Sequence, residues 1–210
     1  MAEPAALVEE TVEEVVLPPL VTQRLQASFG DAIRKSYVNR GDLYYVVDRE
    51  QIVAIVTMLK EDPDLQYDYF VECLGVDYST WTHPRDLSER FEVVYNLYST
   101  KSLSRVFLKV GVDDGQSVPT LRNVFLGAEY PEREIQDLYG VQFEGNQDHP
   151  GRFLLPDDWI GFPLRKEYPL GGEDVLFDGG TRGPGVEDKM VPHAGESFHG
   201  RTGTTDVSGR

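Results

Sequence analysis

Glu-Tyr-Pro-Glu-Arg-Glu-Ile-Gln-Asp-Leu-Tyr-Gly-Val-Gln-Phe-Glu-Gly occupies residues 129–145, and Gly-Phe-Pro-Leu-Arg-Lys-Glu-Tyr-Pro follows at 161–169. The first run predicts a short helix from Pro131 to Gly140, because proline suits the first turn of a helix and glycine suits the position just after its last turn. Glu132 lies in the first turn, where the helix dipole favours negative charge. A short helix capped at both ends is therefore expected, and irregular chain follows it.

The predicted helix has an apolar face and a charged face. Ile135, Leu138 and Tyr139 lie at the spacing i, i+3 and i+4, which places them on one side of a helix. Arg133 and Asp137 are four residues apart and are expected to form an ion pair on another side. One face should therefore pack against the rest of the protein while the other carries charge.

These residues also carry a family signature. The run from Glu132 to Gly145, with Pro-Leu-Arg-Lys-Glu-Tyr-Pro at 163–169, closely resembles the thirty-kilodalton subunit of NADH:quinone oxidoreductase, respiratory complex I. Residues 155–161 are similar to the version found in cyanobacterial and plastid relatives, and the resemblance extends over residues 67–170. It implies a structural signature or subunit interface formed by Glu132, Arg133, Glu134, Asp137, Tyr139, Gly140, Trp159, Pro163, Leu164, Arg165, Lys166 and Tyr168.

The chain departs from the family pattern in two places. Many members have Gly-His-Pro after the helix, whereas His149 and Pro150 lie further along this chain and are interpreted as the displaced motif. Members often have His before Pro-Leu-Arg-Lys, where this chain has Phe162. No role of that histidine is therefore transferred to Phe162.

The resemblance implies an α+β fold and a function within an assembly. This chain would be a structural subunit in the peripheral arm of a proton-translocating enzyme, with no cofactor and no active site of its own. It would pack against the subunit that forms the quinone site and the subunit that bears the terminal cluster, and the partner subunits would hold FMN, iron–sulfur clusters and quinone. It would associate with the cytoplasmic side of a prokaryotic cell membrane only through the complex.

Two alternatives remain open from the sequence. The equivalent subunit of a related membrane-bound hydrogenase, or of a ferredoxin-dependent quinone oxidoreductase, shares the signature, and the donor assay would separate these from complex I. A free-standing hydrolase could instead use the carboxylates of Glu134 and Asp137. The hydrolase predicts a concave pocket around these acids and activity from the isolated chain.

Composition bounds the class of protein. The chain has 210 residues, 40% of them hydrophobic, which suffices for one core. Its formal net charge of −16 argues against a nucleic-acid surface, because no stripe of Lys and Arg could neutralise phosphates. No apolar run approaches the roughly 20 residues of a membrane span, and no signal peptide is evident, so a soluble protein is expected. Cys73 cannot hold an iron–sulfur cluster alone and is interpreted as a core thiol.

Hydrophobic periodicity predicts nine elements before residue 145 in the order α-β-β-α-β-β-β-α-α. This order favours a two-layer α+β domain, with one mixed sheet of about five strands and helices on one face. The last three strands should form an antiparallel meander. Helices are predicted at 18–29, 48–62, 117–127 and 131–139, and strands at 32–38, 43–47, 69–78, 91–99 and 105–112.

Three regions are expected along the chain. Residues 1–17 contain five acids and no basic residue, which is typical of a flexible leader. Residues 18–144 form the α+β domain. Residues 145–210 are expected to be extended and to wrap a partner subunit, with an end that is disordered or ordered by a neighbour. Aromatic anchors without periodicity support this interpretation: Phe153, Trp159, Phe162, Tyr168 and Phe177.

The charges of the predicted helix allow three interpretations. Glu132, Glu134 and Asp137 could be catalytic acids, or they could match the helix dipole and form ion pairs. The interpretation favoured by the resemblance is that the charges fix the helix against its own C-terminal segment and a neighbouring subunit. Arg165 and Lys166 could bind an anion but are more typical of an interface pair.

Other candidate chemistry is weak. His193 and His199, with Glu196 between them, could suggest a metal site, but structural zinc normally has four ligands that include cysteine. No glycine-rich dinucleotide motif, phosphate loop or nucleophile elbow is present in the sequence. The residues alone therefore favour an interaction subunit over an enzyme.

Overall fold

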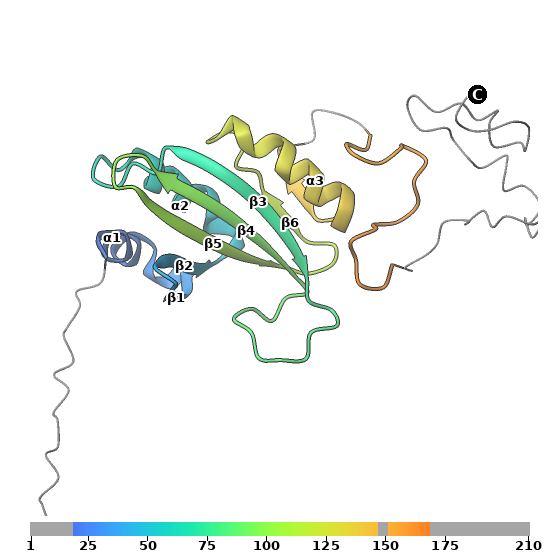
Figure 1. Cartoon of the computed structure of the whole chain (residues 1–210), viewed down its shortest axis with the longest axis horizontal. Helices are drawn as coiled ribbons and strands as arrows, with labels where there is room; N and C mark the ends of the chain where they lie inside the picture. Colours follow the sequence, from blue (N-terminus) through green and yellow to red (C-terminus); the bar gives the residue numbers. More distant parts are fainter. Residues whose placement is uncertain (1–18, 147–150, 169–210) are drawn as a thin grey trace, which may run out of the picture. The chain divides into compact units, whose positions relative to one another are not determined.

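Segments rich in valine and aromatic residues form a five-stranded sheet in the chain, whose computed structural model describes residues 19–146 and 151–168 (Figure 1). The spatial order of the strands is β1-β2-β5-β4-β3. All neighbours pair antiparallel except β2 and β5, which run parallel. The predicted mixed sheet and its antiparallel meander are therefore confirmed. The strands are β1 (Ile33–Asn39), β2 (Asp42–Val47), β3 (Tyr69–Asp77), β4 (Phe91–Ser99) and β5 (Ser104–Val112).

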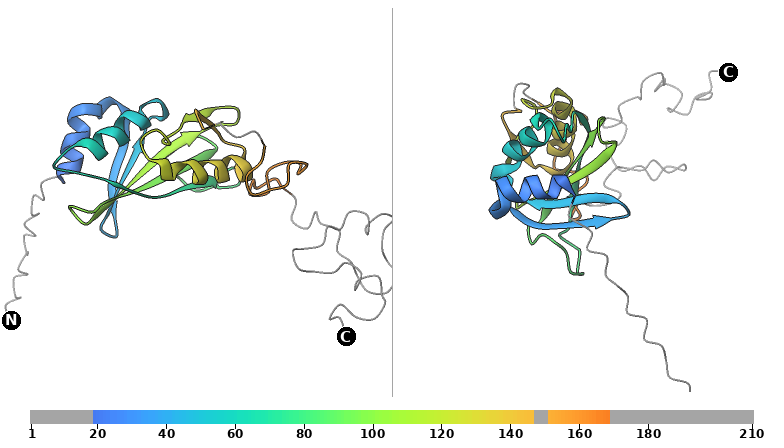
Figure 2. Two further views of the ribbon diagram at one scale, coloured as in Figure 1. Left: turned by 90° about the horizontal axis from the view of Figure 1, so that it is seen from above. Right: turned by 90° about the vertical axis from the view of Figure 1, so that its left-hand side faces the viewer.

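Helices cover one face of this sheet (Figure 2). They are α1 (Leu20–Phe29), α2 (Ile52–Glu61) and α3 (Glu129–Tyr139). A row of paired residues crosses four strands beneath them, namely Tyr45, Leu108, Tyr95 and Cys73, and all four are buried. Apolar side chains of all three helices complete this core. The predicted role of Cys73 as a core thiol is thereby confirmed, and burial raises the pKa of that thiol well above its ordinary value.

The helix predicted at 117–127 is wrong. Ser117–Pro119 form a short strand, β6, which pairs parallel with β7 (Gln142–Glu144), and a 3-10 turn follows at Leu126–Ala128. Val118 precedes a proline, which disfavours the helical conformation, and it is buried together with Phe143 of β7. Tertiary pairing therefore decides the structure of this segment, although its apolar spacing fits a helix.

Two helix starts also differ from expectation. Asp48 makes no capping bond to the following turn; its carboxylate instead accepts a hydrogen bond from Nε of Arg34 at 2.6 Å. A 3-10 turn precedes α2, which begins at Ile52. Helix α3 begins two residues before Pro131, so the proline lies within its first turn, where the missing N–H costs nothing.

Several predictions fall on residues outside the described ranges. These are the leader at 1–17, the histidine at 149, and everything in the segment 169–210, including Phe177 and the two tail histidines. Within residues 19–146 and 151–168, no helix combines the length and apolarity that crossing a membrane requires.

Candidate functional site

Helix α3 is held against the sheet by its apolar face. Ile135 and Tyr139 both lie over Gly75 of β3. A Cβ atom at Gly75 would lie 2.9 Å from Cδ2 of Tyr139 and 3.1 Å from Cγ2 of Ile135. The absence of a side chain at Gly75 therefore lets the helix approach the strand closely, and the packing predicted for this face is confirmed.

Glu132 lies on the same packed face and is fully buried. Its Oε1 accepts a hydrogen bond from the backbone N–H of Leu121 at 2.8 Å. Its Oε2 accepts one from the Thr120 hydroxyl and one from Nδ2 of Asn146, the latter at 3.0 Å. This carboxyl group thus joins α3 to the turn after β6 and to the chain that leaves β7.

Burial governs the ionisation of Glu132. Burial raises the pKa of the carboxyl group from 4.5 to about 7, and the hydrogen bonds from Thr120, Leu121 and Asn146 only partly oppose this rise. The expectation that Glu132 matches the helix dipole on a charged face is therefore wrong. The sequence contained a signal, since Glu132 precedes Ile135 by three residues and Tyr139 by seven, the spacing of one helix face.

Asp137 holds residues 151–168, which we call the strap. Its Oδ2 accepts hydrogen bonds from the backbone N–H groups of Leu154 at 2.7 Å, Leu155 at 2.9 Å and Phe153 at 3.3 Å. Its Oδ1 accepts one from Nη1 of Arg152 at 3.1 Å. Burial opposes ionisation, but the backbone N–H groups and Arg152 outweigh it and lower the pKa of Asp137.

Arg152 ties the beginning of the strap to its middle. Its guanidinium donates to the carbonyl oxygens of Asp137 and Trp159, both at 3.0 Å, and of Gly161 at 2.9 Å. The same group lies 5.3 Å from the ring centroid of Phe162. Arg152 is thus the cation that Asp137 pairs with, and the predicted Arg133–Asp137 ion pair is wrong.

Phe162 is placed between two guanidinium groups. The guanidinium of Arg165 lies 4.7 Å from its ring centroid, and that of Arg152 contacts the same ring. Arg165 also donates from Nε to the carbonyl oxygen of Tyr139 at 2.6 Å and pairs with Asp114 at 2.9 Å. A neutral aromatic ring suits this position, because cations are attracted to its face.

Asp77 at the end of β3 fixes the last part of the strap. Its Oδ2 accepts the backbone N–H of Lys166 at 2.9 Å, and the guanidinium of Arg90 donates to both of its oxygens. Arg90 in turn pairs with Glu167 of the strap. Burial disfavours the charged form of Asp77, but Arg90 and the Lys166 N–H prevail and lower the pKa from 3.8 to about 2.

The remaining charges of α3 point outward. The Arg133 guanidinium lies 4.9 Å from the ring centroid of Phe153, and Glu134 is exposed. The carboxylate of Asp137 is already saturated with donors from the strap. Glu134 and Asp137 therefore do not form a pair of free carboxylates of the kind that the hydrolase alternative requires.

The other signature residues lie within the strap. The backbone N–H of Trp159 donates to Pro156 at 3.0 Å, and that of Tyr168 donates to Arg165 at 3.0 Å. The backbone N–H of Leu164 donates to the carbonyl oxygen of Leu138 on α3 at 3.1 Å. Pro163 is half-buried and the Lys166 side chain is exposed. These residues shape a strap whose path is fixed by backbone bonds.

The strap leaves a set of apolar side chains uncovered. Ile160 is 88% exposed, and it is accompanied on the strap and the adjoining part of α3 by Tyr130, Phe153, Leu154 and Leu164, all between 37% and 56% exposed. The Tyr130 and Phe153 rings are in contact, with centroids 5.4 Å apart. Ordered backbone with uncovered apolar side chains is typical of a protein interface.

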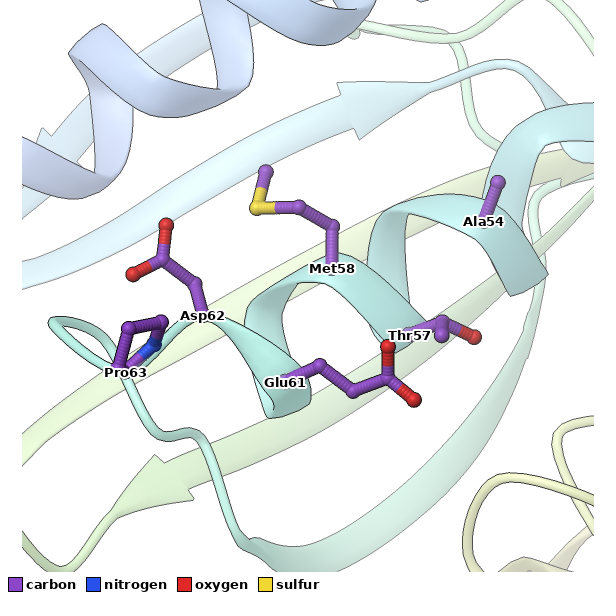
Figure 3. A pocket seen from close by; sticks show the side chains of 6 residues that line it. All are labelled: Ala54, Thr57, Met58, Glu61, Asp62 and Pro63. Carbon is purple, nitrogen blue, oxygen red and sulfur yellow. The ribbon is translucent and has the colours of Figure 1, made fainter.

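Other chemistry is not assembled in the described part of the chain. Residues 19–146 and 151–168 contain no group of three or more His, Cys, Asp or Glu side chains that could hold a metal ion. A shallow depression of about 550 Å³ along α2 is lined by Ala54, Thr57, Met58, Glu61, Asp62 and Pro63 (Figure 3). None of these six residues contacts the strap or carries the predicted signature.

Sequence reasoning missed the residues that hold the strap from outside the helix. Arg152, Asp77 and Arg90 were not among the candidates, because each is isolated in the sequence from its partner. Asp77 and Lys166 are 89 residues apart. No local spacing rule could have joined them, whereas the in-phase position of Glu132 was visible.

Gly140→Ala is expected to loosen the strap. Gly140 ends α3 with φ at 78°, and a Cβ atom there would lie 2.6 Å from the Phe162 ring and 2.9 Å from Nη2 of Arg165. Gly115→Ala is a matched control, because its φ is 79° and nothing lies within 4 Å. Each variant should lose about 1–2 kcal/mol for the left-handed backbone, and only Gly140→Ala should also increase proteolytic cleavage of the strap. Equal cleavage of both variants would contradict the contact.

A helix-covered mixed sheet that holds an apolar strap in place defines an interaction domain of the α+β class. The family model described as "Respiratory-chain NADH dehydrogenase, 30 Kd subunit" matches residues 45–174. The chain therefore belongs to this family, which confirms the resemblance seen in its sequence.

Relatives of known name agree with this assignment. The chain is 45% identical over 160 residues to an NADH-quinone oxidoreductase subunit of Roseiflexus sp. (strain RS-1), covering 75% of this chain and 87% of that protein. It is 42% identical over 152 residues to the NADH-quinone oxidoreductase subunit of the same name from Geobacter sulfurreducens, covering 72% of this chain and 89% of that protein.

Two solved structures share the fold. A trypsin-resistant fragment of Nqo5 aligns with a TM-score of 0.52 and 29% identity, covering 61% of this chain and 98% of the fragment. A chain of the archaeal membrane-bound sulfane sulfur reductase aligns with a TM-score of 0.58 and 24% identity, covering 71% of this chain and 84% of that chain. The second similarity concerns the fold alone.

Proposed function

We propose that this chain is a non-catalytic, cofactor-free structural subunit in the peripheral arm of a proton-translocating NADH:quinone oxidoreductase. Its strap and α3 would dock on the subunit that forms the quinone site and on the subunit that bears the terminal cluster. FMN, iron–sulfur clusters and quinone would belong to those and other partner subunits. The chain would reach the cytoplasmic side of the prokaryotic cell membrane only through them.

The observation that carries this proposal is the way the strap is held. Asp137 and Asp77 fix its backbone from the inside, so Ile160 and its apolar neighbours are presented outward in a defined arrangement. A preorganised apolar surface loses little conformational entropy on docking, which favours tight association with another protein. Neither carboxylate is left available for general acid or base chemistry, which counts against the hydrolase alternative.

The proposal can be tested by isolating the assembly. Tagged chain is recovered from detergent-solubilised membranes, its partners are identified by mass spectrometry, and NADH oxidation by the eluate is assayed with quinone. We expect the cluster-bearing and quinone-site subunits together with NADH:quinone activity. The same partners with activity from another donor alone would favour the related hydrogenase or ferredoxin-dependent complexes. A solitary chain would refute the proposal.

A further inference from the structure

The loop between β3 and β4 carries an aromatic tip that the strap does not explain. The loop, residues 78–90, projects beyond the ends of these two strands (green, Figure 1). Its base is fixed to β1 by ion pairs of Lys35 with Asp86 at 2.6 Å and of Arg34 with Glu89 at 2.5 Å. The acidic side chains of the loop are therefore engaged by cations of the domain itself.

The tip of this loop, residues 79–84, has the opposite character. All six residues are exposed, and none is Asp, Glu, Lys or Arg, although 27% of the chain is charged. Trp81 is 54% exposed. An uncharged aromatic tip on a strongly acidic chain is unusual, because an exposed loop gains solubility from charge.

Trp81 is held in place before any partner binds. Its ring meets the His83 ring edge-on, with centroids 5.2 Å apart, and the Tyr78 ring at 6.1 Å. Its backbone N–H donates to the carbonyl oxygen of Tyr78 at 2.9 Å, and the Arg85 guanidinium lies 4.7 Å from the Tyr78 ring centroid. A tryptophan with restricted motion loses little entropy when it is buried, which is the property of an interface anchor.

Asp77 fixes this loop and the strap relative to each other. Its Oδ1 accepts the backbone N–H of Ser79 at 2.9 Å, while its Oδ2 accepts the N–H of Lys166 at 2.9 Å. Arg90, at the other end of the loop, pairs with both Asp77 and Glu167. The aromatic tip and the end of the strap therefore start from one shared carboxylate and form a continuous surface.

We infer that the tip at 79–84 is a second anchor on the same neighbouring subunit that receives the strap, with Trp81 inserted into an apolar pocket of that subunit. Such a pocket would offer an oxygen acceptor for the indole N–H, because tryptophan is an apolar body with one polar donor. A lipid surface fits less well, because the tip lacks the Lys and Arg residues that attract anionic headgroups. This inference rests on the proposed docking of the strap.

Site-specific photo-crosslinking in the intact complex tests the inference. The probe p-benzoylphenylalanine replaces Trp81, Ile160 of the strap, or Leu103, which is 74% exposed in the turn between β4 and β5 at the other end of the sheet. We expect Trp81 and Ile160 probes to crosslink to the same subunit and the Leu103 probe to give no such product.

Each other result overturns a defined part. Crosslinks from Ile160 alone, or from Trp81 to lipid or to a different subunit, would refute the second anchor and leave the docking of the strap intact. No crosslink from either probe would refute both. A product of equal yield from Leu103 would show that the Trp81 crosslink is unspecific and would also refute the second anchor.

Trp81→Ala supplies an independent measure. Because the side chain is half-exposed, the circular dichroism and thermal unfolding of the full chain should not change. The affinity of the chain for the complex lacking it should fall at least about tenfold, whereas Leu103→Ala should leave it unchanged. Unchanged affinity of Trp81→Ala would contradict the anchor.

Discussion

Asp137→Ala is expected to release the strap and to abolish most of the assembled complex. The substitution removes the acceptor for three backbone N–H groups and leaves the guanidinium of Arg152 without its carboxylate. Removing one partner of a buried charged pair costs about 3–5 kcal/mol. That loss exceeds the contribution of an exposed contact, so the strap should become a good substrate for proteases in the isolated chain.

Asp158→Ala is the matched control for this variant. Asp158 lies in the same strap and is exposed, so its removal should leave both cleavage and assembly unchanged. Arg133→Ala should have an intermediate effect, because Arg133 loses only its contact with the Phe153 ring. Blue-native gels of membranes would report the amount of complex, and quinone titrations would report the KM of what remains.

Assembly should change before substrate affinity does. If Asp137 orders a docking surface, the small amount of complex that forms with Asp137→Ala should have a nearly normal KM for quinone. A normal amount of complex with an altered KM would contradict the structural role and would return attention to the chemistry of the carboxylate itself.

The fold could be predicted from the sequence where one face of each element is buried. Strands β3, β4 and β5 are long, rich in Val, Tyr and Phe and separated by turn residues, so their existence and their antiparallel order followed from local rules. Segment 117–127 failed because its apolar spacing fits a helix, whereas the buried contact of Val118 with β7 comes from residues far along the chain. Local periodicity cannot report such a contact.

The candidate site divides in the same way. The sequence identified α3 and the strap as parts that belong together, and it placed Asp137 among the residues that join them. It assigned Asp137 to Arg133, since both lie on one helix, while the folded chain offers Arg152 with a closer match to the carboxylate. An ion pair on an exposed helix face gains little, so a partner that also binds backbone carbonyls prevails.

The stability of the domain is expected to fall between pH 5 and pH 8 because of Glu132. Its pKa is about 7 in the folded chain against 4.5 ordinarily, so the folded chain binds this proton more tightly than the unfolded chain. The contribution of the protonated group is complete below pH 4.5, is lost as the pH rises towards 7, and changes no further above that. The total loss is about 3 kcal/mol at 1.36 kcal/mol per pKa unit.

Glu132→Gln should remove most of this dependence. The amide does not titrate, so the urea midpoint of the variant should change less between pH 5 and pH 8 than that of the unaltered chain. Cys73 and Tyr95, which interact with Glu132, do not titrate in this range because burial raises the pKa of both well above ordinary values. Glu134→Gln, exposed on the same helix, should keep the original profile.

The variant should also be less stable than the unaltered chain at pH 5. Nδ2 of Asn146 donates to Glu132 and to the carbonyl oxygen of Glu129, so an amide N–H₂ at position 132 meets a donor that cannot turn away without losing a bond. As the pH rises and the carboxylate becomes costly, the two stabilities should converge. Parallel profiles for the variant and the unaltered chain would mean that Glu132 does not carry the proton, and a shifted profile in Glu134→Gln would assign the titration to the exposed face of α3.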